Sequence, residues 1–208
     1  MVNNFFDKIF LLNLDRRKDR LEKCITILES HNIEYERFSA IDGSKIDGDM
    51  GPLLKGEIGC RTSHLNIIKK AKKEKLNSIL ILEDDFEMCD NFIESFESTI
   101  KQLPVDWEWL YFGGSHFEEP TIMSGNIYKV NKTYTTHAYA IKKEIYDKLI
   151  ETLEVSEPAD VRLSLLQKEL NVYVTIPHLI TQRDGYSDIQ NNNVSYNGIR
   201  ESKLNVSK

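Results

Sequence analysis

Three consecutive carboxylate side chains follow the most apolar run of the sequence. They are Glu83, Asp84 and Asp85, directly after residues 78–82, Ser-Ile-Leu-Ile-Leu. Like charges a few ångströms apart disfavour joint ionisation, so such a cluster is most stable where water or a hard divalent cation compensates it. Because side chains alternate along a strand, Glu83 and Asp85 are expected to point one way and Asp84 the other. The triplet therefore predicts an oxygen site for Mg²⁺ or Mn²⁺, with a solvated acidic turn before the next helix as the alternative.

A basic segment near the start of the sequence could bind a phosphate. Asn13 ends a short apolar run, and Arg16, Arg17 and Arg20 fall at the start of a helical pattern. A helix N-terminus with arginines suits a phosphate, although charged residues there commonly just face water. We predict that Asn13 and Arg17 contact a ligand and that Arg20 is structural. Asp42, after the next apolar run, is predicted to bond a ribose or a base unless it simply forms an Asp-Gly turn.

The elements that must position these groups alternate between strand and helix. Apolar runs predict strands at 8–14, 33–41, 78–82 and 109–112, and helical spacing predicts helices around 21–28, 56–75 and 92–103. Further along we expect a hairpin of 126–130 with 134–141, helices near 143–153 and 159–170, and a strand near 172–176. Such alternation is typical of an α/β fold with a mostly parallel central sheet, whose ligands bind beyond the carboxyl ends of the strands.

Composition narrows the class of protein. The 208 residues carry 27 basic and 33 acidic side chains, a formal net charge of −6, which does not match a general nucleic-acid binder. Three cysteines without CxxC spacing argue against a disulfide framework and against a structural zinc site. We find no apolar run that could span a bilayer and no secretory signal, so the expected location is the cytoplasm. A chain of this length can form one domain with its own core.

Four separated segments of the sequence resemble glycosyltransferase family 25, the lipopolysaccharide and collagen galactosyltransferase type. They are residues 12–20, 56–65 and 82–85, and Gln182 followed by Ser-Asp-Ile at 187–189. Their order and spacing match the family from residue 8 to residue 189. The resemblance implies a GT-A fold and an inverting transfer of a sugar from a nucleotide donor, usually a UDP-sugar. It also places the acidic triplet where such enzymes keep their DxD metal motif, so that Glu83 and Asp84 could contact the donor as well as the metal.

The resemblance also implies roles for residues outside the triplet. It places the predicted helix 56–75 against the donor, which makes Arg61 and His64 candidate donor contacts, although a lone histidine is often a core residue. Inverting transfer requires a carboxylate that deprotonates the acceptor hydroxyl. The resemblance puts this acid at Asp160, with Glu157 as the fallback. The alternative for Asp160 is an ordinary helix cap.

The last candidates lie further along the chain. Gly113 and Gly114 follow the predicted strand 109–112 and would let the backbone approach a bound sugar, unless they only form a tight turn. GT-A enzymes often take a late metal ligand from the C-terminal region. We predict His178 for it, with Gln182 and Asp188 left open as alternatives.

These features predict a metal-dependent inverting glycosyltransferase. It would use Mn²⁺ or Mg²⁺ to move a hexose from a nucleotide sugar, a UDP-sugar, to a hydroxyl of a glycan or glycoconjugate acceptor. One domain, 1–208, would comprise a donor-binding half over about 1–115, an acceptor-side half over about 116–182 and a polar tail, 183–208, with the composition of a mobile segment. The alternatives are a non-catalytic nucleotide-sugar-binding module, and another Mg²⁺-dependent nucleotidyl or phosphoryl transferase, against which the missing GxxxxGK[ST] loop argues.

Overall fold

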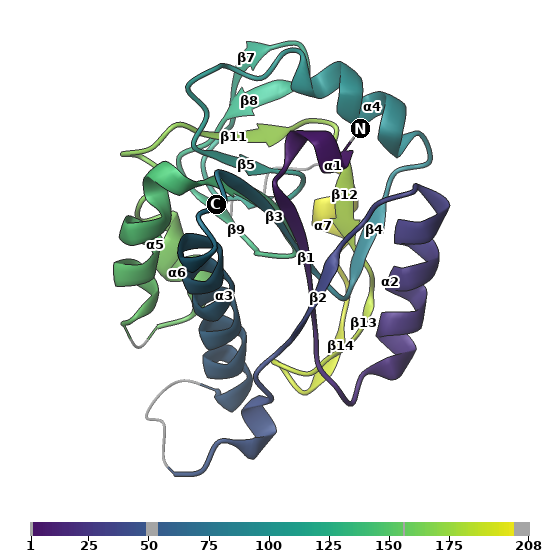
Figure 1. The fold of residues 1–208 in the computed structure, drawn as a ribbon, viewed down its shortest axis with the longest axis vertical. Helices are drawn as coiled ribbons and strands as arrows, with labels where there is room; N and C mark the ends of the chain where they lie inside the picture. The colour runs from purple at the N-terminus through teal and green to yellow at the C-terminus, as the bar shows by residue number, and fades with distance from the viewer. Residues whose placement is uncertain (1, 49–53, 156, 202–208) are drawn as a thin grey trace.

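An eight-stranded sheet forms the centre of the computed structural model, which describes residues 2–48, 54–155 and 157–201 (Figure 1). The strands, in spatial order, are β2 (Glu36–Ser39), β1 (Lys8–Asn13), β3 (Ser78–Glu83), β10 (Ala138–Lys142), β5 (Trp109–Tyr111), β11 (Val172–Thr175), β8 (Ile127–Lys129) and β7 (Thr121–Ser124). Strands β10 and β8 run opposite to their neighbours, and the other strands of this sheet share one direction. The predicted GT-A-like α/β class with a mostly parallel central sheet is therefore confirmed.

Helices cover both faces of the sheet. On one face lie α2 (Lys18–Ser30) and α4 (Phe92–Ile100), and on the other lie α3 (Lys55–Lys73), α5 (Tyr146–Leu153) and α6 (Ala159–Ser164) (Figure 1). The side chains of β3 point alternately to the two faces of the sheet. Leu80 and Leu82 pack with α2 and α4, while Ile79 and Ile81 pack with α3 and α5. A strand buried on both faces needs an unbroken apolar run, which is why these strands are recognisable in the sequence.

Short elements complete the fold. They are α1 (Val2–Phe5), η1 (Gly43–Lys45), η2 (Lys143–Ile145) and α7 (Asn197–Arg200), with three strand pairs, β12 (Ile180–Gln182) with β4 (Phe86–Met88), β13 (Gly185–Ser187) with β14 (Asn192–Val194), and β6 (Ser115–His116) with β9 (Thr133–Tyr134). The predicted polar tail thus contains β13, β14 and α7, and its residues 202–208 lie outside the described ranges. Within those ranges, no helix has both the length and the apolar character needed to cross a bilayer.

The predicted hairpin of 126–130 with 134–141 is wrong. Strand β8 pairs with β7 and β11, whereas β10 is inserted between β3 and β5. The physical reason is burial: residues 138–141, Ala-Tyr-Ala-Ile, are all fully buried. A segment with apolar side chains on both faces is stabilised at the centre of a covered sheet rather than in an edge hairpin.

The acidic triplet lies at the edge of the sheet where parallel strands end together. In the register of the sheet, Leu12 of β1 faces Glu83 of β3, and Asn13 faces Ser39 of β2. The carboxyl ends of these three strands therefore meet at one edge, as the alternating pattern predicted.

Two glycines of α3 bring other segments to this edge. A Cβ atom on Gly59 would lie 2.5 Å from the backbone oxygen of Ile41, and one on Gly56 would lie 2.7 Å from the Cα of Ile189. Glycine therefore permits the loop after β2 and the β13–β14 hairpin to pack directly on the first turns of α3.

Candidate active site

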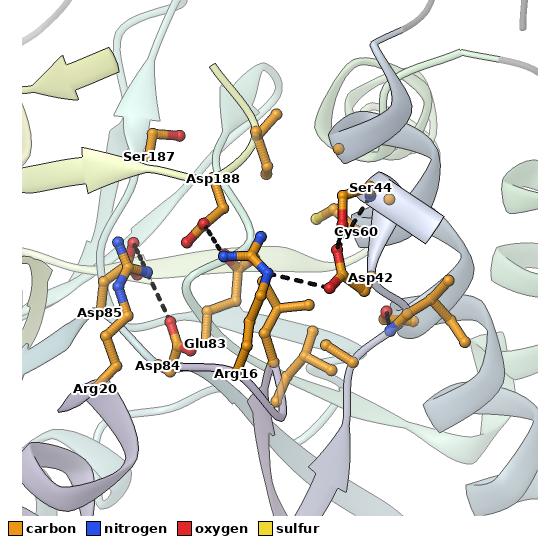
Figure 2. A pocket seen from close by; sticks show the side chains of 18 of the residues that line it. Arg16, Arg20, Asp42, Ser44, Cys60, Glu83, Asp84, Asp85, Ser187 and Asp188 are labelled. Atoms are coloured by element: carbon orange, nitrogen blue, oxygen red, sulfur yellow. Dashed lines mark hydrogen bonds and ion pairs between the residues drawn. The ribbon is translucent and has the colours of Figure 1, made fainter. Parts of the chain in front are cut away.

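A cleft of about 420 Å³ opens at the carboxyl ends of β1 and β3 (Figure 2). The loop after β1, the loop 40–44, the start of α3 and the segment 187–196 form its walls, and the acidic triplet lies at one side. Among its lining residues are two arginines, Arg16 and Arg20, and the carboxylates of Asp42, Asp85 and Asp188. Basic and acidic groups therefore face the same cavity.

Asp84 has protein partners at both carboxylate oxygens. Asn13 Nδ2 donates to Oδ2 at 2.7 Å, and Arg20 Nη1 donates to Oδ1 at 2.7 Å. Arg183 Nη2 donates to the backbone oxygen of Asp84 at 2.6 Å. The first two bonds satisfy the carboxylate. Together the three bonds hold the start of α2 and the segment after β12 beside Asp84.

Glu83 is fixed from the other side of the sheet. Its Oε1 accepts a hydrogen bond from Thr136 Oγ1 at 2.5 Å and lies 3.0 Å from His64 Nε2, while His64 Nδ1 lies 2.9 Å from the hydroxyl of Tyr139. Burial alone would raise the pKa of Glu83, but the hydrogen bonds and the charge of His64 lower it below 4.5. The Glu83 carboxylate is therefore held ionised and in one orientation.

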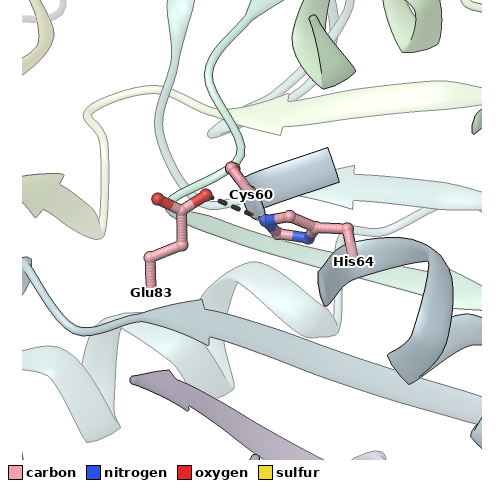
Figure 3. Close-up of side chains that lie close together, drawn as sticks. All are labelled: Cys60, His64 and Glu83. Atoms are coloured by element: carbon pink, nitrogen blue, oxygen red, sulfur yellow. Dashed lines mark hydrogen bonds and ion pairs between the residues drawn. The ribbon is translucent and has the colours of Figure 1, made fainter. Parts of the chain in front are cut away.

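Cys60 completes a compact cluster with His64 and Glu83 (Figure 3). One donor atom from each lies within 4.8 Å of the others, and in the part of the chain that the structure describes no other group of this kind occurs. His64 already engages Glu83, and burial, followed by the charges of Glu83 and Asp160, raises the pKa of the Cys60 thiol. A protonated thiol is a poor metal ligand. The cluster is therefore better explained as the network that orients Glu83.

Asp85 differs from its two neighbours because one of its oxygens lacks a partner. Its Oδ2 accepts hydrogen bonds from Gln182 Nε2 at 3.1 Å and from Arg20 Nη1 at 3.4 Å, but its buried Oδ1 has none. Burial, and then the charge of Glu83, raises the pKa of Asp85 to about 7. An unpartnered buried carboxylate oxygen is costly, and a bound cation is one group that would compensate it.

Arginines connect the first turns of α2 to the β13–β14 hairpin. Arg16 donates to Asp42 at 3.0 Å and to Asp188 at 2.6 Å (Figure 2). Arg17 also pairs with Asp188. Arg20 donates to the backbone oxygen of Tyr186 at 2.7 Å. Guanidinium groups bind phosphate as readily as carboxylate, so the arginine side of the cleft is suited to an anionic ligand.

The predicted site residues fall into three groups: residues that line the cleft, residues that support them from behind, and residues that lie away from it. Four of them, Asp42, Glu83, Asp84 and Asp85, line the cleft. Asp42 also accepts a hydrogen bond from the backbone N–H of Ser44 at 3.0 Å, so it stabilises the η1 turn as well as facing the cavity. The second group consists of residues that support the first from behind.

Among the supporting residues, Asn13 is fully buried and bonds Asp84, and His64 is fully buried and bonds Glu83. Arg17 binds Asp19 and Asp188 and does not line the cleft, and Arg61 donates to the backbone oxygen of Val155. Their contacts are structural, and any role toward the donor is exerted through the side chains that they hold.

Gly113, Gly114 and His178 lie away from the lining residues. A Cβ on Gly113 would be 2.2 Å from the backbone oxygen of Ile180, so this glycine permits β12 to pack against the end of β5. Gly114 packs in the same way on Thr133. His178 Nε2 lies 3.0 Å from His116 Nε2, and His178 Nδ1 lies 2.7 Å from the backbone oxygen of Ile199.

The predicted base, Asp160, lies in the first turn of α6 and does not line the cleft. Its carboxylate accepts the backbone N–H of Val161 at 2.9 Å, and burial raises its pKa. It is close enough to Cys60 for its charge to raise the pKa of that thiol. Glu157 is exposed and pairs with Arg162 at 3.4 Å.

Several lining residues were not predicted. Arg16 lay beside the predicted Arg17, and Ser187 lay in a segment that matched the family, so both had a signal. Tyr196 had none, because it follows a polar stretch without periodicity. Burial, and then the charges of Asp85 and Glu83, raises the pKa of its hydroxyl to about 12, which places it close to the acids.

Replacing His64 tests the network behind Glu83. His64→Leu is expected to lower the free energy of unfolding by about 3 kcal/mol, because the buried Tyr139 hydroxyl loses its partner and Glu83 keeps only the hydrogen bond from Thr136. The folded-state pKa of Glu83 is below its ordinary value of 4.5, so this contribution is complete above pH 4.5 and is lost as the pH falls through the lower, folded-state pKa. Urea unfolding at a series of pH values measures it. His64→Gln, which keeps an N–H donor, should recover most of the loss, and equal losses in both variants would contradict the network.

Comparisons with known proteins support a family for this chain. Residues 6–163 match the family model described as Glycosyltransferase family 25 (LPS biosynthesis protein). The chain is 29% identical over 171 residues to procollagen galactosyltransferase 2 of Homo sapiens, covering 70% of this chain and 27% of that protein. It is also 29% identical over 186 residues to a glycosyltransferase 25 family member of Drosophila melanogaster, covering 77% of this chain and 30% of that protein. The chain therefore spans less than a third of the length of these two relatives.

Two solved structures resemble the fold. A glycosyltransferase involved in the glycosylation of the major capsid of PBCV-1 matches with a TM-score of 0.54 at 10% identity, covering 88% of this chain and 95% of that chain. A197 from STIV matches with a TM-score of 0.53 at 11% identity, covering 96% and 95%. At such low identity these matches show the fold alone. Because the family model covers most of the sequence, the chain belongs to glycosyltransferase family 25.

Proposed function

We propose that this chain is an inverting glycosyltransferase that transfers a hexose from a UDP-sugar to a hydroxyl of a glycan or glycoconjugate. The proposal depends on one observation: Arg16 and Arg20 line the same cleft as the Asp85 carboxylate, which has a buried oxygen without a partner. A nucleoside diphosphate with a divalent cation would match both. Family membership supports the reaction class, and the name of the human relative makes galactose the first hexose to test.

The side chains present fit a hard divalent cation. Glu83 is ionised and fixed by His64 and Thr136, and Asp85 offers the unpartnered Oδ1, so an all-oxygen donor set suited to Mn²⁺ or Mg²⁺ lies at the strand end. A cation bound there would supply charge neutralisation for a departing diphosphate. Asp84 keeps the triplet in place through Asn13 and Arg20.

The rest of the cleft is assigned by chemistry. Arg16 and Arg20 would bind the phosphates, and Asp42 with Ser44 would face the ribose and base. We retain Asp160 as the base that takes the proton of the acceptor hydroxyl, because burial raises its pKa toward the range in which a carboxylate accepts a proton usefully. The family description also makes a lipopolysaccharide precursor an acceptor class to test beside protein hydroxyls.

Calorimetry with UDP tests the proposal. We expect UDP to bind at least about tenfold more tightly with Mn²⁺ than without it, since a cation held by the acids would neutralise the charge of the diphosphate. The Asp85 proton competes with the metal, so with a pKa of about 7 the Mn²⁺ affinity should rise with pH below 7 and level off above it. A panel of UDP-sugars then identifies the donor by slow hydrolysis. Absence of any metal-linked UDP binding would count against the assignment.

A further inference from the structure

Gln182 is held beside Asp85 by backbone pairing on both sides of the contact. Strand β12 pairs with β4 in a register that places Gln182 opposite Phe86, the residue after Asp85. The backbone N–H of Arg183 donates to the backbone oxygen of Asp85 at 2.7 Å. The relative position of the two side chains is therefore set by the ladder and not by a mobile loop.

The orientation of the Gln182 amide is fixed by its neighbour. Its Nε2 donates to Asp85 Oδ2 at 3.1 Å, and the reversed amide would place two oxygens in contact. The amide oxygen, Oε1, is therefore turned away from Asp85 Oδ2, and it is buried without a hydrogen-bond partner, like Asp85 Oδ1. Gln182 is only 7% exposed and it lines the cleft. Two neighbouring residues of the same wall thus each present a buried oxygen that lacks a donor.

We propose that Gln182 is a direct oxygen ligand of the divalent cation, beside Asp85 and Glu83. The inference rests on the proposed function, and it identifies the late ligand from the C-terminal part of the chain. Amide and carboxylate oxygens are the groups that Mn²⁺ and Mg²⁺ prefer, and a cation there would satisfy both unpartnered atoms at once.

The other two candidates for this ligand are already engaged. The ring nitrogens of His178 lie at hydrogen-bond distance from His116 and from the backbone oxygen of Ile199, and His178 does not line the cleft. Asp188 does line it, but its two carboxylate oxygens pair with Arg16 and Arg17. Gln182 therefore has the better geometry for the cation, and Asp188 provides a control.

The test measures Mn²⁺ binding directly. Free Mn²⁺ is titrated by electron paramagnetic resonance, with and without saturating UDP, in the wild-type chain and in Gln182→Met, Gln182→Glu and Asp188→Asn. Gln182→Met keeps the volume but removes the oxygen, so we expect Mn²⁺ affinity to fall at least about tenfold. Gln182→Glu loses the N–H donor to Asp85 but retains a ligand oxygen, so we expect affinity equal to or above that of the wild type. Asp188→Asn should stay within about twofold for Mn²⁺ alone, a change too small to reflect a lost ligand.

The Glu variant separates a ligand from a residue that only positions Asp85. If Gln182 acts only through its N–H donor, Gln182→Glu places a second carboxylate against Asp85 without the stabilising bond and should bind Mn²⁺ no better than Gln182→Met. That result, or wild-type affinity in Gln182→Met, would overturn the inference while leaving the proposed function intact. Failure of the wild-type chain to bind Mn²⁺ with UDP would instead overturn the proposed function. Metal-free melting curves identify any variant that does not fold.

Discussion

If the proposed cation site is correct, Asp85→Asn is expected to abolish metal-linked UDP binding and to lower sugar transfer by about 10³-fold, because a bound cation would contribute several kcal/mol to the reaction. The variant keeps the shape of the side chain, and an amide oxygen can still accept the hydrogen bonds that Gln182 and Arg20 donate to Oδ2. What it removes is the negative charge at the atom that has no partner. Calorimetry with UDP and Mn²⁺, together with a transfer assay on the same preparations, measures both effects.

The same variant should be more stable than the wild-type chain when no metal is present. Burial, and then the charge of Glu83, raises the pKa of Asp85 from 3.8 to about 7, so the folded state binds this proton more tightly than the unfolded state does. Its contribution to the free energy of unfolding therefore falls as the pH rises from about 4 to about 7. Removing the charge should recover stability on the order of 4 kcal/mol at pH 8 and little at pH 4.

Matched measurements test whether the Asp85 carboxylate supports metal binding and lowers the stability of the metal-free protein. Asp90→Asn makes the same chemical change at an exposed residue beyond β4 and should alter neither stability nor binding. Guanidinium unfolding at pH 4 and pH 8 gives the stability difference. An Asp85→Asn protein that is destabilised at pH 8, or that retains Mn²⁺-linked UDP binding, would show that Asp85 is a structural acid.

The acidic triplet could be predicted because its chemistry and its position are both local properties. An unbroken apolar run identifies a strand that is buried on both faces, and side-chain alternation separates Asp84 from Glu83 and Asp85. In the structure all three acids line the cleft: Glu83, the last residue of β3, bonds His64 and Thr136, whereas Arg20 donates to both Asp84 and Asp85 because these two residues lie in the turn after the strand. No pattern near residue 84 indicates which distant side chains will meet it, and for that reason Asn13 was predicted as a ligand contact rather than as a partner of Asp84.

The parts that sequence reasoning missed depend on contacts between distant segments. Residues 134–141 have the alternation of a hairpin strand, and the position of β10 between β3 and β5 follows from the complete burial of residues 138–141. The polar tail has no periodicity, yet Tyr196 forms part of the cleft because the β13–β14 hairpin packs on glycines of α3. His64 was identified as a candidate from its type and neighbours, but its pairing with Glu83 and Tyr139 requires the sheet register.

Asp160→Asn should lower kcat by about 10²- to 10⁴-fold, the range that general acid–base catalysis contributes, with little change in UDP and Mn²⁺ affinity. Asp160 is the second residue of α6 and not its N-cap, and the amide oxygen of asparagine can still accept the bond from the Val161 N–H, so the folded stability should change little. A role limited to that bond therefore predicts near-normal turnover in this variant, whereas a base role predicts its loss.

The control for Asp160 is Glu157→Gln, which neutralises an exposed acid just before the same helix. This variant should keep turnover within about twofold, since an exposed group contributes little to the reaction or to the fold.

The pH dependence of kcat provides an independent readout. Burial raises the pKa of Asp160, so its protonation should produce an acidic limb in the kcat profile at a pH above the ordinary value of 3.8, and that limb should be absent from the residual activity of Asp160→Asn. Full activity in Asp160→Asn would return the search for the base to the acids that line the cleft.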